Sequence, residues 1–148
     1  MLKERLTEDM KAAMKSGDAF ALSIVRMALS AVSNKSIEKR GKGLAPEMSD
    51  EEILDVLAKE AKRRDDAAQQ FAAGGRADLA ENELKERAFL EKYLPAQMPR
   101  EEVVAAVEAI IAASATKDFP SVMKEAMAQL KGKADGKIVG EIVKEKLA

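Results

Sequence analysis

The sequence predicts an all-α protein, and three observations support this fold class. Apolar residues make up 47% of the 148-residue chain, but aromatic residues contribute only 3% and Trp is absent. Ala, Leu, Met and charged residues dominate, and these residues favour helices. Apolar residues recur at helical spacing in seven segments, and most glycines and prolines fall between these segments.

Residues 1–94 are predicted to form an N-terminal helical bundle of about four helices. The first two cover about residues 2–15 and 18–39. The centre of the second is apolar around most of its circumference, so we expect it to be the buried central helix of the bundle. Arg26 interrupts this apolar run, and we expect it to be ion-paired or to extend its charged end to the surface rather than to bind a ligand.

The third helix has recognisable ends. Ser49 and Glu52 form a capping box where it begins, and Gly74-Gly75 ends it. Its apolar stripe is interrupted by Glu60 and Arg64, which are four residues apart. Side chains at this spacing are neighbours on a helix surface, so we expect a partly buried ion pair.

The fourth helix, residues 76–92, leads into the best domain boundary of the chain. Two prolines in Leu94-Pro95-Ala96-Gln97-Met98-Pro99 make continuation of a helix there unfavourable. We therefore expect residues 95–148 to form a small C-terminal domain of three helices. These helices cover about residues 100–113, 120–130 and 135–147.

The stretch Gly132-Lys133-Ala134-Asp135-Gly136-Lys137 joins the last two predicted helices. Its first glycine can take the left-handed conformation that ends one helix, and its aspartate can cap the next, which predicts a structural corner. Three lysines near a helix N-terminus also favour an anion, so a phosphate-facing corner is the alternative. Only three residues separate the glycines and Ile138 replaces the required hydroxyl, so the stretch is not a nucleotide-binding P-loop.

Composition excludes several classes of function. The chain contains no His and no Cys, which rules out a Ser-His-Asp triad, a thiol nucleophile and His or Cys metal sites. We expect no catalytic residues, cofactor or metal. The formal net charge is −1, so any nucleic-acid binding must come from a local patch. Without a membrane-spanning segment, a signal core or a disulfide framework, we expect a cytoplasmic protein.

Five short motifs occur in the same order in YqeY-like proteins, and the chain resembles this (GatB/YqeY) family along essentially its whole length. The family in turn resembles the C-terminal tail of the B subunit of tRNA-dependent amidotransferases. The motifs are Ser49-Asp50-Glu51-Glu52, Lys62-Arg63-Arg64, Gly74-Gly75-Arg76-Ala77-Asp78-Leu79, Glu91-Lys92-Tyr93-Leu94-Pro95 and Gly132-Lys133-Ala134-Asp135-Gly136-Lys137.

The resemblance implies a non-catalytic tRNA-binding or accessory module, because the tail helps to hold tRNA while the chemistry lies in other domains of that enzyme. It also links the family to glutamine-dependent carbon–nitrogen ligase activity. The alternative is a protein-interaction module that docks onto a synthetase or amidotransferase partner. Phe119-Pro120-Ser121-Val122 departs from the family pattern, which often has Met-Gly-Lys-Val there. The nucleic-acid-binding residues that the resemblance implies are Lys131, Lys133, Lys137, Arg63, Arg64 and Arg76.

Overall fold

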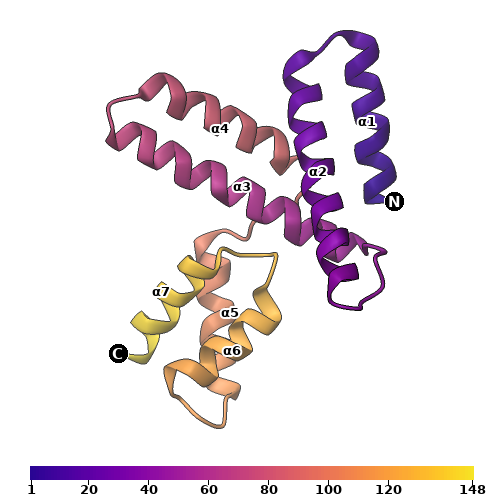
Figure 1. The fold of residues 1–148 in the computed structure, drawn as a ribbon. Helices are drawn as coiled ribbons and strands as arrows, with labels where there is room; N and C mark the ends of the chain where they lie inside the picture. Colours follow the sequence, from indigo (N-terminus) through magenta and orange to yellow (C-terminus); the bar gives the residue numbers. More distant parts are fainter. The chain divides into compact units, whose positions relative to one another are not determined.

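The computed structural model describes residues 1–148, and all seven of its regular elements are α-helices (Figure 1). The predicted all-α fold class is confirmed. By their internal contacts, the residues fall into two compact units, Met1–Leu94 and Pro95–Ala148. None of the helices combines the length and the apolar character needed to cross a bilayer.

The first unit consists of two helical hairpins, α1 with α2 and α3 with α4 (Figure 1). Gly17 ends α1 in the left-handed conformation, with φ of 72°. The Asp18 carboxylate then accepts a hydrogen bond from the Ala21 amide at 3.0 Å, which starts α2. The four helices are α1 (Leu2–Ser16), α2 (Ala19–Gly41), α3 (Asp50–Ala73) and α4 (Ala77–Glu91).

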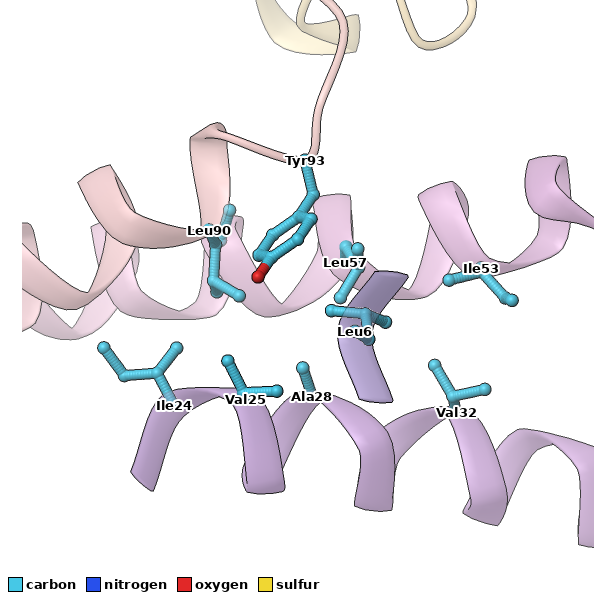
Figure 2. Close-up of a cluster of buried hydrophobic side chains, with 10 residues drawn as sticks. Leu6, Ile24, Val25, Ala28, Val32, Ile53, Leu57, Leu90 and Tyr93 are labelled. Carbon is cyan, nitrogen blue, oxygen red and sulfur yellow. The ribbon is translucent and has the colours of Figure 1, made fainter. Parts of the chain in front are cut away.

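One apolar cluster joins all four helices of this unit. Figure 2 shows the α2 side chains on one side of the cluster and the α3 side chains on the other, with Leu6 of α1 between them. Helix α4 contributes Leu90, and Tyr93 lies in the turn just after the end of this helix. The fully or nearly buried members are Leu6, Ile24, Val25, Ala28, Val32, Ile53, Leu57, Ala61, Leu90 and Tyr93.

The prediction that α2 is the buried central helix holds for one side of the helix only. Its buried residues lie on one side, while Phe20 and Met27, at the margin of that side, are 43% and 38% exposed. The neighbouring helices cover only part of a helix of 23 residues, so its other apolar side chains remain accessible. Arg26 was expected either to form an ion pair or to extend its charged end to the surface. It is exposed and forms no ion pair, so the second expectation is confirmed.

The predicted capping box of α3 is confirmed. The Ser49 hydroxyl accepts a hydrogen bond from the Glu52 amide at 3.2 Å, and the Glu52 carboxylate accepts one from the Ser49 amide at 2.9 Å. The Lys39 side chain donates to the same carboxylate at 2.8 Å. These contacts hold the pKa of Glu52 below its usual value, chiefly because the ammonium group of Lys39 stabilises the charged form.

The second unit is a bundle of three helices with its own apolar core. Asp118 caps α6 by accepting from the Ser121 amide at 3.0 Å, and Pro120 occupies the first turn, where a missing amide hydrogen costs little. The buried side chains of all three helices form a single cluster. The helices are α5 (Arg100–Ala113), α6 (Phe119–Leu130) and α7 (Gly136–Leu147).

Candidate nucleic-acid interface

The corner between α6 and α7 has a well-fixed backbone. Gly132 has φ of 78°, a left-handed conformation that favours glycine, as the sequence predicts. Leu130 and Ala134 on either side are 4% and 9% exposed and belong to the core of the second unit. The Met98 amide donates to the Lys133 carbonyl at 2.8 Å, which ties the corner to the segment before α5. The corner is therefore a rigid support for the side chains that it carries.

The three predicted lysines of this corner, Lys131, Lys133 and Lys137, are all exposed. The helix terminus beside them is already occupied, because the Asp135 carboxylate accepts from the Lys137 amide at 2.8 Å. An incoming phosphate would have to displace this cap to reach the amides. The corner can thus offer ammonium groups to an anion, while its helix dipole is largely neutralised by its own aspartate.

Arg64 is not available to a phosphate, and we remove it from the candidate surface. It is 6% exposed, and its guanidinium donates to the Glu60 carboxylate at 2.9 Å and to the Glu86 carboxylate at 3.2 Å. A third donation, at 3.0 Å, reaches the thioether of Met27 on α2. The predicted Glu60–Arg64 ion pair is confirmed, but Arg64 links three helices instead of facing a ligand.

Arg63 and Arg76 remain exposed, yet each has an acidic neighbour. Arg63 pairs with Glu60 at 3.1 Å, and Arg76 pairs with Asp78 at 3.3 Å. The Arg76 guanidinium also holds the pKa of Asp78 below its usual value. Exposed pairs of this kind contribute little to stability because water screens them, so a phosphate could displace the carboxylate, but only in competition with it.

A hollow of about 390 Å³ in the first unit lies between α1, the start of α2 and the end of α4. Its polar groups already have partners. The Tyr93 hydroxyl donates to Asp9, the Arg5 guanidinium lies 4.7 Å from the centre of the Tyr93 ring, and Asp18 caps α2. Burial first, and the Asp9 carboxylate second, raise the pKa of Tyr93. This group therefore serves to attach α1 to the end of α4.

These features define a small all-α module with an exposed basic corner. The chain belongs to the YqeY-like family, because the family described as "Yqey-like protein" matches residues 3–147. This confirms the predicted resemblance.

Several proteins named "Altered inheritance of mitochondria protein 41, mitochondrial" are similar to the chain. The Kluyveromyces lactis protein is 36% identical over 142 residues, which cover 93% of this chain and 71% of that protein. The Candida glabrata protein is 34% identical over 89 residues, covering 60% of this chain and 47% of the relative. The protein of Saccharomyces cerevisiae strain YJM789 is 35% identical over 94 residues, covering 64% and 48%. The chain thus spans about half the length of most of these relatives.

Proposed function

We propose that this protein is a tRNA-binding accessory module whose α6–α7 corner contacts phosphates. The observation that carries the proposal is the exposure of Lys131, Lys133 and Lys137 on a rigid corner of a YqeY-like chain. Ammonium groups at fixed positions recognise the spacing of phosphates and therefore the shape of a folded RNA. Base-specific recognition is disfavoured, because the chain has only four Phe and one Tyr for stacking.

The proposed binding is electrostatic and depends on salt. At 0.1 M monovalent salt, releasing one counterion from a phosphate contributes a factor of about 5 to affinity, from a salt slope of about 0.7 per contact. Lys133 and Lys137 then supply a factor of about 25 together. Asp135 lies beside them and reduces this figure, and the rest of the chain adds no general attraction because acidic residues outnumber basic ones there.

In this proposal the protein holds tRNA in place, and a partner protein catalyses the reaction on it. The chain contains neither His nor Cys, so any amide transfer linked to the family would take place on an amidotransferase or synthetase partner. The names of the relatives place those proteins in mitochondria. We propose that this chain works in a compartment in which tRNA is aminoacylated.

A titration of tRNA with the full chain at two salt concentrations tests the proposal. We expect Lys133→Glu with Lys137→Glu to weaken binding by at least 25-fold at 0.1 M salt and to flatten the salt dependence. The matched control is Lys117→Glu with Lys124→Glu, which makes the same charge change at two other exposed positions of the second unit. The control should bind within about threefold of wild type.

Two outcomes would reject the proposal. If the corner variant and the control weaken binding equally, only the net charge matters and the corner is not the contact. If the wild-type chain does not bind tRNA even at low salt, the protein-docking alternative takes its place. That alternative would use exposed apolar side chains such as Phe119, 44% exposed, and Ile138, 38% exposed.

A further inference from the structure

Helix α2 carries a long exposed face without a single carboxylate. No Asp or Glu occurs between Asp18 and Glu38. Every residue of the face is exposed, and all but one are polar or basic. We call this face the α2 strip; it consists of Ser23, Arg26, Ser30, Ser33, Ile37 and Arg40.

Helix geometry places the two arginines of the α2 strip in line. Arg26, Ser33 and Arg40 are seven residues apart, which is close to two turns of an α-helix, so they lie along one stripe. At a rise of 1.5 Å per residue, the stripe is roughly 21 Å long. Helix α2 is continuous over this whole length, from Ala19 to Gly41 (Figure 1).

These two arginines differ from the other arginines of the first unit. Neither Arg26 nor Arg40 forms an ion pair. The others already have partners: Arg5 lies over the Tyr93 ring, while carboxylates bind Arg63, Arg64, Arg76 and Arg87. A guanidinium without a carboxylate binds an external phosphate without first losing a contact, so the α2 strip is the better phosphate ligand on physical grounds.

The N-terminal end of α1 extends the α2 strip. Lys3, Ser33 and Ser36 line a hollow of about 120 Å³ between α1, α2 and the loop that follows α2. One carboxylate, that of Glu47, lines the same hollow. Ser36 already donates to the Pro46 carbonyl at 2.6 Å, which leaves Lys3 and Ser33 as the groups available to an anion there.

We propose that the α2 strip binds the phosphate backbone of RNA, as a second contact surface of the tRNA-binding module. This inference rests on the proposed function. Two arginines can each take a phosphate through two parallel hydrogen bonds, and the intervening serines add neutral donors. The stripe is long enough for several successive phosphates of a strand. A protein partner is a poorer match, because Ile37 is the only apolar side chain of the strip and stable protein interfaces have an apolar centre.

The test compares two charge-matched double variants of the full chain in tRNA titrations. Arg26→Gln with Arg40→Gln should lower affinity by about 25-fold at 0.1 M salt and reduce the salt slope by about 1.4, from two lost contacts. Arg87→Gln with Arg100→Gln removes the same charge from arginines that have carboxylate partners and lie outside the candidate surface. We expect this control to bind within about threefold of wild type. A larger effect of the control than of the α2 strip variant would overturn the inference.

Further variants distinguish a failure of the α2 strip inference from a failure of the proposed function. If the α2 strip variant binds like wild type while the corner variant Lys133→Glu with Lys137→Glu is weak, the α2 strip inference fails and the proposed function stands. If wild type does not bind tRNA, both fail. Arg26→Lys with Arg40→Lys should restore most of the salt slope but less of the affinity, because lysine keeps the charge and loses the paired hydrogen bonds. Competition by polyglutamate as effective as competition by RNA of equal charge would also reject phosphate recognition.

Discussion

Replacing Arg64 by methionine should destabilise the first unit far more than the same change at its neighbour Arg63. Arg64 is 6% exposed and donates to Glu60, Glu86 and the sulfur of Met27, so its guanidinium connects α2, α3 and α4. Methionine retains the aliphatic stem and removes the charge and all of its hydrogen bonds. Both carboxylates are then left without their buried partner.

The structure sets the size of this effect. Breaking a fully buried ion pair costs about 3–5 kcal/mol, because an uncompensated charge remains in the interior. Here the side chains of Glu60 and Glu86 are 15% and 23% exposed, so water can partly solvate them. We therefore expect a loss of about 2–3 kcal/mol in the free energy of unfolding. The Arg63 side chain is 77% exposed, and Arg63→Met should cost about 0–1 kcal/mol.

Urea denaturation followed by tyrosine fluorescence measures this difference directly. Tyr93 is the only Tyr, the chain has no Trp, and Tyr93 is 7% exposed in the core of the first unit. Its signal therefore reports on the unit that contains Arg64. With a slope of about 1.5 kcal/mol per M, the Arg64→Met midpoint should fall by about 1.5 M.

Equal and small midpoint shifts for Arg64→Met and Arg63→Met would refute the reasoning. A second measurement checks its cause. In a double-mutant cycle, Arg64→Met combined with Glu86→Gln should show a coupling free energy of about 1–2 kcal/mol, because the two side chains touch. Additive effects would mean that the loss comes from packing alone.

Three further predictions concern other contacts. Tyr93→Phe removes the hydroxyl that donates to Asp9 and should cost about 1 kcal/mol. The pKa of Tyr93 is raised in the folded state, so near pH 10 only the unfolded chain loses the phenolic proton. The free energy of unfolding of the wild type should therefore fall above that pH, by up to about 1.4 kcal/mol per pH unit. Circular dichroism melts of Tyr93→Phe should lack this pH-dependent loss. Asp135→Asn keeps a capping oxygen and removes the charge, so tRNA affinity should rise several-fold while the melting temperature changes little; unchanged affinity would place the phosphate elsewhere. Ser49→Ala should cost about 1 kcal/mol in the fluorescence-detected urea transition, and a loss below about 0.3 kcal/mol would show that the capping box contributes little.

Local chemistry explains why the helices could be read from the sequence. The capping box of Ser49 and Glu52, the left-handed glycine at position 132 and the cap at Asp135 each depend on residues within a few positions of one another. Such interactions are encoded in short stretches of chain. The predicted and observed helix ends accordingly differ by at most two residues.

The candidate site was predictable only in part. The corner lysines follow from the residue pattern, because neighbours in the chain stay together at a tight turn. The arginines were harder to assign. Arg64 has the same charge as Arg63 and follows it directly in the chain. Only the tertiary structure, which brings Glu86 of α4 next to Arg64, shows that Arg64 is buried. Arg26 looked like an interruption of an apolar helix, and its exposure depends on which side of α2 the other helices cover.

The sequence by itself therefore determined the helices, their caps, the basic corner and the resemblance to YqeY-like proteins, because each is carried by local spacing or by ordered motifs. Tertiary structure alone decided which charges are available. It buries Arg64 in a contact between α2, α3 and α4. It leaves Arg26 and Arg40 exposed on α2 without a carboxylate partner. The physical reason is that burial and ion pairing depend on residues far apart in the chain, whose positions no single helix pattern contains.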